Sequence, residues 1–295
     1  MICMKVLILG ATGMLGKALM QEAFLRNLEA IGIARKNTEI SIDITDDHSL
    51  TNFIFESRPD VVINAAAIVS HEDCENDPGN AYNVNARAVS VLADICASIK
   101  AYFIQISTDH YYTGDKDLAH DENYPEKLLN EYARSKYAGE CFALLNADTL
   151  VVRTNIVGFR DRKGQPTFLE WGINSILEDK SIVLFDDYYT SSITVKQFSV
   201  SLFDLIEKRP RGILNIACRE VASKKQFIES IAKEMGVTLS KTKSGSVLDF
   251  KGTRRAESLG LDVRKAESVL SYKLPDFQEV VSNLVTEYKP RGEKI

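Results

Sequence analysis

Long hydrophobic runs are missing from this sequence of 295 residues. The first apolar stretch, Val6 to Leu9, stops at Gly10, which makes it too short for the apolar part of a signal peptide. No later stretch reaches the roughly 18 apolar residues that a membrane span needs. We therefore expect a soluble, cytoplasmic protein that is not exported and has no membrane partner.

Paired cysteines are missing as well. The five cysteines are widely spaced, and none forms the Cys-x-x-Cys pattern that binds zinc or makes a redox dithiol: Cys3, Cys74, Cys96, Cys141 and Cys218. We also find no carboxylate cluster that favours magnesium, so no metal site is predicted. A reduced protein fits this cysteine usage best.

Concentrated positive charge is the third absence. The formal net charge is −5 and the basic residues form only short clusters, so nucleic acid is not expected as a partner. Hydrophobic residues make up 45% of the chain and charged residues 26%, which are ordinary values for a globular protein. Neither disorder nor a coiled coil is indicated.

The elements that the pattern predicts alternate between strands and helices. Strands of apolar and β-branched residues recur with helical segments between them: residues 5–9, 29–35, 59–67, 101–108 and 149–158. This order favours an α/β fold with a Rossmann-type, doubly wound parallel sheet. We assign residues 1–157 to an NAD(P)-binding domain to which 185–210 return. We assign 158–184 and 211–295 to a smaller, irregular α/β substrate-binding part.

A glycine-rich turn, GATGMLG, stands between the first predicted strand and the first predicted helix. Such a turn needs residues without side chains, and it lets the helix N-terminus face a pyrophosphate. The alternative is a purely structural turn between strand and helix. The flanking elements favour dinucleotide binding, with these contacts: Gly10, Thr12, Gly13, Met14, Leu15 and Gly16.

The end of the second strand indicates which dinucleotide is bound. An acidic residue there would bind the ribose 2′-hydroxyl, whereas this chain has Ala34-Arg35-Lys36. We therefore predict NADP(H) rather than NAD(H), with Arg35 near the 2′-phosphate, unless both cations are merely solvated. Further cofactor contacts are predicted at Asp43 and Ile44 for the adenine and at the small residues Ala65, Ala66 and Ala67, although the alanines could serve packing alone.

Hydroxyl groups end the fourth main strand at Ser107-Thr108-Asp109, where ligands of open α/β sheets bind. Tyr132 and Lys136 follow on a predicted helix, one turn apart and so on one face. Each feature alone is weak, because strand-end hydroxyls often act as caps and Tyr–Lys pairs often face solvent. Together they have the spacing of a known catalytic constellation.

That constellation resembles the extended short-chain dehydrogenase/reductases, and more narrowly the sugar-nucleotide reductases similar to dTDP-4-dehydrorhamnose reductase. The motifs GATGMLG, NAAA, STD, YARSKYAGE and VVRTNIVG fall in that family's order, and the match covers most of the chain. Two positions depart from the family pattern, because Ser192 and Arg255 stand where proline is usual. The departures affect the segments expected to form the substrate pocket.

The resemblance implies that Thr108, Tyr132 and Lys136 are the catalytic trio. Tyr132 would give a proton to the carbonyl oxygen while the nicotinamide gives a hydride to the carbon. Lys136 would lower the pKa of the phenol together with the nicotinamide, and would bind the nicotinamide ribose. Thr108 would hold the carbonyl oxygen by a hydrogen bond.

The substrate side is predicted from fewer signals. Asp109-His110 replaces the Asp-Glu pair usual in related 4,6-dehydratases, which favours a simple reductase. His71, Thr108, Asp109 and His110 are predicted substrate contacts, with a structural role as the alternative for the histidines. Arg254 is predicted to pair with a nucleotide diphosphate, although an exposed turn suits it equally.

The resulting hypothesis is an NADPH-dependent reductase that acts on a keto group, at C4, of a nucleotide-linked deoxysugar in polysaccharide or glycoside biosynthesis. Two alternatives stay open. One is a regulatory subunit similar to the beta subunit of methionine adenosyltransferase, which resembles these reductases. The other is a sugar-nucleotide epimerase. The resemblance also implies a homodimer.

Overall fold

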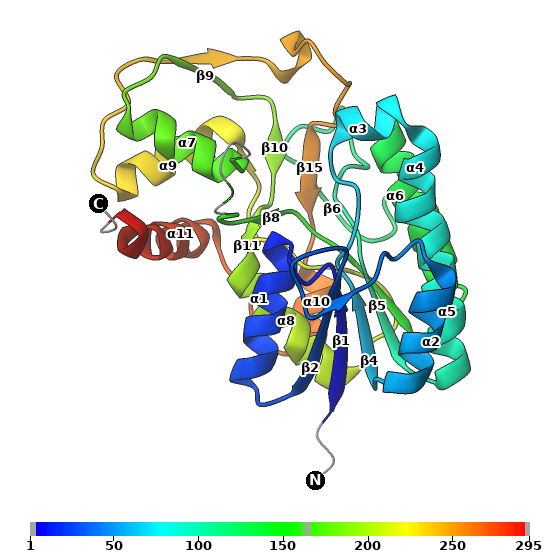
Figure 1. The fold of residues 1–295 in the computed structure, drawn as a ribbon. Helices are drawn as coiled ribbons and strands as arrows, with labels where there is room; N and C mark the ends of the chain where they lie inside the picture. Colours follow the sequence, from blue (N-terminus) through cyan, green and yellow to red (C-terminus); the bar gives the residue numbers. More distant parts are fainter. Residues whose placement is uncertain (1–3, 161, 163–165, 293–295) are drawn as a thin grey trace.

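A seven-stranded parallel sheet forms the centre of the computed structural model, which describes residues 4–160, 162 and 166–292. Its strand order is β12-β7-β5-β4-β1-β2-β3, and each hydrogen-bonded pair is parallel (Figure 1). The strands are β1 (Lys5–Leu9), β2 (Glu29–Ala34), β3 (Ile40–Ser41), β4 (Val61–Asn64), β5 (Tyr102–Ile106), β7 (Thr149–Arg153) and β12 (Gly212–Asn215). The predicted α/β class is confirmed.

Helices cover both faces of this sheet, because its strands are apolar on both sides. Val6 and Ile8 of β1 pack in one core with α1 (Met14–Leu25), α8 (Val195–Lys208) and α10 (Arg264–Leu270). Leu7 and Leu9 point to the other core, which includes residues of α2 (Asp47–Ser57) and α5 (Ala88–Ile99), with α6 (Glu131–Ala143) beside α5. The strand ends that carry the predicted motifs therefore meet at one edge.

A smaller part lies beyond that edge and has its own apolar core (Figure 1). Its helices are α7 (Phe168–Leu177), α9 (Lys224–Glu234) and α11 (Phe277–Gly292). Short strands tie it together in the order β13-β10-β15-β6, with the pairs β14-β9 and β11-β8. Their bounds are β6 (Ala119–His120), β8 (Ile156–Val157), β9 (Ile182–Phe185), β10 (Tyr189–Thr190), β11 (Ile193–Thr194), β13 (Ala222–Ser223), β14 (Thr242–Gly245) and β15 (Ser258–Leu261). A 3-10 turn spans Val247–Asp249.

The predicted border at residue 211 needs correction. β12 pairs with β7 as an edge strand of the main sheet, and α10 packs against α8 and β12. Leu261, Val263 and Ala266 are buried in the core of the sheet domain. After the chain first enters the smaller part, it therefore returns to the Rossmann-type domain twice, first with α8 and β12 and then with α10. Both returns bury apolar side chains against the sheet face that α1 and α8 cover.

Shorter elements complete the connections. The helical segment between β4 and β5 consists of α3 (His71–Asn76), α4 (Pro78–Tyr82), a π-helical turn (Asn83–Arg87) and α5. The short strand β6 lies between β5 and α6, and β10 lies between β9 and β11. None of the helices in the described ranges is both long and apolar enough to cross a membrane.

Candidate active site

The glycine turn after β1 has the geometry that a pyrophosphate site needs. Gly10 has φ +80°, and a Cβ on Gly16 would lie 2.1 Å from the Gly10 carbonyl oxygen, so α1 packs directly on the turn. Gly13 is the exposed N-cap of α1, and no side chain caps the helix. The first N–H groups of α1 are therefore open to an anion. Of the neighbouring predicted contacts, Thr12 and Met14 are half-buried, whereas Leu15 packs inward.

The loop after β4 closes against this turn. A Cβ on Gly10 would lie 2.9 Å from the backbone of both Ala65 and Ala66. The side chain of Asn64 supports the loop by accepting a hydrogen bond of 3.1 Å from the Ala66 N–H. Ala65, Ala66 and Ala67 remain partly exposed, so the small residues keep space beside the glycine turn.

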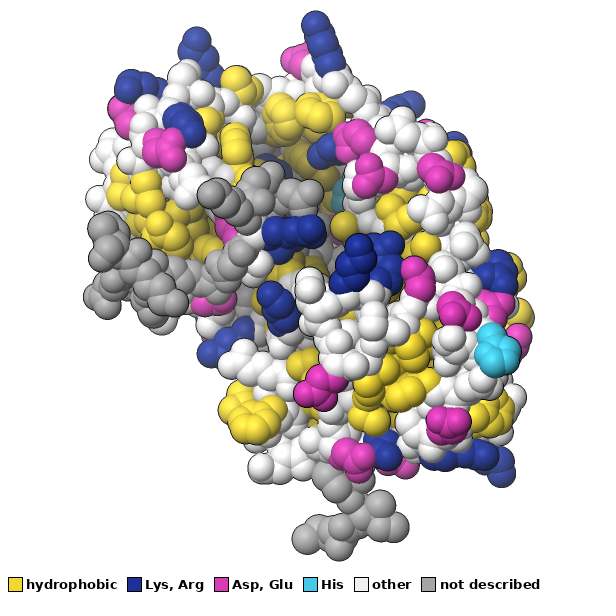
Figure 2. All heavy atoms as spheres, viewed as in Figure 1, with side chains coloured by type: hydrophobic (Ala, Val, Ile, Leu, Met, Phe, Trp, Pro, Cys, Tyr) yellow, Lys and Arg dark blue, Asp and Glu magenta, His cyan; other side chains and the backbone are white. Residues whose placement is uncertain are grey.

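The end of β2 carries unpaired positive charge. Arg35 and Lys36 are exposed, and within the described part of the chain neither forms an ion pair. Figure 2 shows Lys and Arg side chains around the hollow between the two lobes of the molecule. Nearby, the Asp43 carboxylate accepts hydrogen bonds from the N–H and hydroxyl of Thr45, at 3.0 and 2.8 Å, and Ile44 is buried. Asp43 therefore shapes its own loop.

The predicted trio comes together at the carboxyl end of β5. Thr108, Tyr132 and Lys136 are 3%, 7% and 4% exposed, so all three lie under the surface. Asn130 caps α6 by accepting a hydrogen bond of 2.8 Å from the Ala133 N–H, which places Tyr132 in the first turn. Lys136 donates a hydrogen bond of 2.8 Å to the Ile106 carbonyl oxygen.

Burial is the largest influence on the pKa values of Tyr132 and Lys136. It raises the pKa of Tyr132 above the usual phenol value, and a hydrogen bond with Thr108 opposes that rise. Burial also lowers the pKa of Lys136 to about 8, against the opposing charge of Glu140. In the protein alone the Lys136 ammonium donates to the Ile106 carbonyl, and the lowering of the phenol pKa by Lys136 together with the nicotinamide stays a prediction. A protonated phenol is nevertheless the form that a proton donor requires.

Two residues that the sequence prediction missed hold the trio in place. Asn85, in the π-helical turn, donates hydrogen bonds to the Ile68 carbonyl at 3.0 Å and to the Ser135 hydroxyl at 3.1 Å. A Cβ on Gly139 would lie 2.2 Å from the Asn85 carbonyl oxygen, so α6 can approach this turn closely only at a glycine. Asn85 could have been identified from the sequence as an asparagine at a position where the helical pattern predicts a buried, apolar residue.

The two predicted histidines meet beside Tyr132. The distance from His71 Nε2 to His110 Nδ1 is 3.2 Å, and the ring of His71 lies 4.7 Å from that of Tyr132. Burial, with the charge of Arg255, lowers the pKa of His71 to about 4, and burial lowers the pKa of His110 well below its usual value. Both imidazoles are therefore neutral at pH 7.

Asp109 is buried at the same place. Its carboxylate accepts a hydrogen bond of 2.6 Å from Asn155, which in turn accepts one of 2.7 Å from Ser192. Burial raises the pKa of Asp109 to about 7, against the hydrogen bond from Asn155. Ser192, at the position where proline is usual in the family, thus connects β10 and β11 to the strand end that carries Thr108.

Arg255, the neighbour of Arg254, faces the histidines and contributes to lowering their pKa values. Arg254 is exposed, and its carbonyl accepts a hydrogen bond of 2.9 Å from Asn130. Arg255 lies over the ring of Phe250 at 4.7 Å and pairs with Glu72 at 3.1 Å. Arg255 is the second departure from the family pattern, and the pairing of Arg254 with a nucleotide diphosphate stays a prediction.

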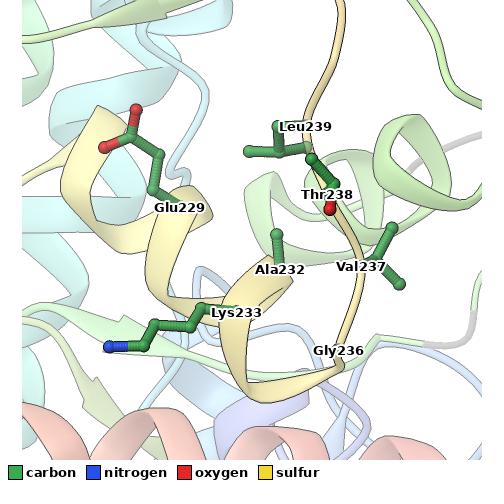
Figure 3. Close-up of a pocket in the computed structure, with 7 residues that line it drawn as sticks. All are labelled: Glu229, Ala232, Lys233, Gly236, Val237, Thr238 and Leu239. Carbon is green, nitrogen blue, oxygen red and sulfur yellow. The ribbon is translucent and has the colours of Figure 1, made fainter.

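A separate hollow of about 390 Å³ lies at the far end of α9 from this cluster (Figure 3). It is lined by Glu229, Ala232, Lys233 and residues 236–239 and contains none of the predicted site residues. The glycine turn, the trio and the two histidines therefore lie outside this hollow. In the described ranges, no three His, Cys, Asp or Glu side chains are grouped so as to hold a metal ion. Cys74, Cys96, Cys141 and Cys218 are free, and Cys3 lies outside the described residues.

Comparison with known proteins places this geometry in context. A family model described as the RmlD substrate binding domain matches residues 4–289. The probable low-salt glycan biosynthesis reductase Agl14 of Haloferax volcanii is 26% identical over 292 residues, covering 95% of this chain and 97% of that protein. Methionine adenosyltransferase 2 subunit beta of Bos taurus is 27% identical over 234 residues, covering 77% and 64%. A solved dTDP-4-dehydrorhamnose reductase from Bacillus anthracis, in complex with NADP, has a TM-score of 0.87 at 23% identity, covering 97% and 99%.

Proposed function

Because this chain belongs to the RmlD substrate binding domain family, we propose that it is an NADPH-dependent reductase of a keto group, at C4, on a nucleotide-linked deoxysugar. The observation that carries the proposal is the convergence of Thr108, Tyr132 and Lys136 beside the uncapped glycine turn. The reductase name of the Haloferax relative supports it. The product would serve polysaccharide or glycoside biosynthesis.

The residues present fit a nicotinamide dinucleotide. The open N–H groups in the first turn of α1, after Gly13, would hold the pyrophosphate, and the small residues Ala65 to Ala67 leave room for the ribose. When bound, the reduced nicotinamide supplies a hydride to the carbonyl carbon. Lys136, charged and buried, would donate hydrogen bonds to the nicotinamide ribose.

Tyr132 is the proposed proton donor to the carbonyl oxygen. Since burial raises its pKa, the phenol is protonated before reaction and can give its proton as negative charge develops on that oxygen. Thr108 would donate a hydrogen bond to the same oxygen and so fix its distance from Tyr132. The neutral histidines His71 and His110 would cover the sugar without adding charge.

Replacing Arg35 by Ala is expected to weaken NADPH binding by about tenfold or more and to change NADH binding little. The reason is that the exposed Arg35 guanidinium follows β2, has no ion-pair partner among the described residues and would pair with the 2′-phosphate that distinguishes the two cofactors. Fluorescence titration of both cofactors measures the change. Equal losses for NADPH and NADH would contradict the role given to Arg35.

The proposed activity is tested with a panel of nucleotide-linked 4-keto-6-deoxysugars carrying dTDP, UDP or GDP. We expect NADPH oxidation, followed by absorbance of the reduced nicotinamide, with at least one of them. Tight NADPH binding without oxidation across the panel would favour the alternative of a regulatory subunit, similar to methionine adenosyltransferase 2 subunit beta. Isomerisation of a sugar nucleotide without net oxidation would favour an epimerase. The homodimer stays a prediction, which analytical ultracentrifugation can test.

A further inference from the structure

A chain of side-chain hydrogen bonds leads from β10 to Thr108. Ser192 stands where proline is usual in the family, so it offers a hydroxyl at a position where proline offers no donor. That hydroxyl lies 3.0 Å from Thr190 Oγ1 and donates a hydrogen bond of 2.7 Å to Asn155 Oδ1. Asn155 Nδ2 donates a hydrogen bond of 2.6 Å to Asp109 Oδ2. The other oxygen of Asp109, Oδ1, is 3.4 Å from the hydroxyl oxygen of Thr108.

The Asn155 amide gives this chain a direction. Its Oδ1 can only accept, so the hydroxyl hydrogen of Ser192 is used there, and Thr190 must donate to Ser192. The reverse orientation of the amide would set its oxygen against a carboxylate oxygen of Asp109. Thr190, Ser192 and Asp109 are 3%, 4% and 1% exposed, so water does not readily replace these partners. Each donor from Thr190 to Asn155 therefore points toward Asp109.

Asp109 can contact Thr108 in two ways. As a carboxylate it accepts a hydrogen bond from the Thr108 hydroxyl, which draws that hydrogen away from a substrate. Because Asn155 occupies Oδ2, a protonated Asp109 can carry its hydrogen on Oδ1 and donate to Thr108 Oγ1. That oxygen also accepts a hydrogen bond of 3.3 Å from the His110 N–H. With both lone pairs of Oγ1 used, the hydroxyl hydrogen of Thr108 is free for a carbonyl oxygen.

Both forms of Asp109 occur near neutral pH. Burial raises the pKa of Asp109 to about 7, against the hydrogen bond from Asn155 and the charge of Lys224. Burial keeps the neighbouring aromatic groups neutral, because it raises the pKa of the phenols and lowers that of the imidazole. The titratable groups that act on Asp109 come from four segments: His110 on its own loop, Tyr132 on α6, Tyr188 before β10 and Lys224 at the start of α9.

We propose that Ser192 and Asn155 are positioning residues that orient Asp109, so that protonated Asp109 donates to Thr108 and fixes Thr108 as the hydrogen-bond donor to the substrate carbonyl. The inference rests on the proposed reductase function and deepens it. Asp109 keeps its proton throughout, and Tyr132 remains the proton donor. An ionised Asp109 would instead capture the Thr108 hydroxyl and place negative charge near an oxygen that becomes negative during reduction. The rate should therefore fall as the pH rises through the pKa of Asp109.

The first test is the pH profile of kcat, measured with saturating NADPH and the sugar nucleotide that the protein reduces. For the wild type we expect a fall of about tenfold near pH 7, where Asp109 titrates, before the later loss when Lys136, with a pKa of about 8, gives up its proton. Asp109→Asn offers an N–H to Thr108 and an oxygen to Asn155 at every pH, so the step near pH 7 should disappear. A wild-type profile without the step, or an Asp109→Asn profile that keeps it, would overturn the inference.

The second test is Ser192→Ala, which leaves Asn155 Oδ1 without its donor and lets the amide turn. The turned amide no longer donates to the carboxylate, so the pKa of Asp109 should rise by about 1. Its oxygen would also draw the proton of Asp109 to Oδ2, away from Thr108, so kcat below pH 7 should fall by about tenfold. Carbon-13 NMR of the Asp109 carboxyl group, assigned by its absence in Asp109→Asn, measures the titration without substrate.

Ser199→Ala is the matched control, because Ser199 is also buried and its hydroxyl donates a hydrogen bond of 2.7 Å to the Val195 carbonyl within α8. It should leave the titration of Asp109 and kcat as in the wild type. If Ser192→Ala behaved like this control, Ser192 would not orient Asp109 and the inference would fail. Failure of the wild type to reduce any sugar nucleotide would instead overturn the reductase proposal, and the NMR titration would still decide whether Ser192 orients Asp109.

Discussion

Replacing Tyr132 by Phe is expected to lower kcat by about 10²- to 10⁴-fold while leaving the affinity for NADPH nearly unchanged. The ring packs with Cys74, Ala81 and Ile68 and lies against His71, and phenylalanine keeps all of these contacts. Only the hydroxyl that would give its proton to the carbonyl oxygen is removed. Single-turnover kinetics with saturating NADPH measures the loss.

Tyr137→Phe is the matched control on the same helix. Tyr137 directly follows Lys136 on α6, and its ring lies edge-on to that of Tyr111 at 5.8 Å, outside the trio. It should keep the wild-type rate. An undiminished rate in Tyr132→Phe would show that another group donates the proton. A loss of NADPH affinity as large as the loss of rate would instead assign Tyr132 to cofactor binding.

The parallel sheet could be predicted because its strands carry a strong local signal. β1, β4, β5 and β7 are short runs of apolar and β-branched residues, which is the pattern of strands buried on both faces. The strands of the smaller part carry no such signal. β10 and β13 have two residues each and pair only because distant segments bring them together. The border at residue 211 was misplaced for a related reason. β12 joins the main sheet only after a long segment that includes elements of the smaller part.

The catalytic candidates could be predicted because Thr108, Tyr132 and Lys136 belong to motifs with fixed spacing. The resemblance on which they were chosen is confirmed at the family level over residues 4–289. The contacts of side chains in the smaller part could not be predicted. In KKQFIES nothing distinguishes Lys224 from Lys225 before the fold places one beside Phe168 and the other beside Ser244. Arg254 and Arg255 are adjacent in the same way.

A buried charge network lies behind the catalytic helix. Arg153 is fully buried, and its guanidinium donates to Glu140 at 2.8 Å, to Glu126 at 2.5 Å and to the Tyr112 hydroxyl at 2.9 Å. Ser107, beside Thr108, donates a hydrogen bond of 2.5 Å to Glu140. Glu140 also raises the pKa of Lys136, one turn away on α6. The network thus joins β5, β7 and α6 beneath the site.

Arg153→Met is expected to lower the free energy of unfolding by about 3–5 kcal/mol, because it leaves the Glu140 carboxylate buried without its partner. Urea denaturation followed by circular dichroism measures the loss. The surface pair Arg211–Asp148, at 2.9 Å, offers a matched control, since Arg211→Met breaks an exposed ion pair and should cost about 1 kcal/mol or less. If Arg153→Met lost as little free energy of unfolding as the control, the Glu140 carboxylate would have to be protonated or hydrated in the variant.

The double variant Arg153→Met/Glu140→Met separates stability from catalysis. Replacing both charges with apolar groups removes the unpaired carboxylate, so most of the lost stability should return. Activity should not return with it, because Lys136 then lacks the Glu140 charge that raises its pKa and loses its proton at a lower pH. The alkaline limb of the kcat profile should therefore move to lower pH in the double variant. A profile identical to that of the wild type would mean that the network supports the fold without tuning Lys136.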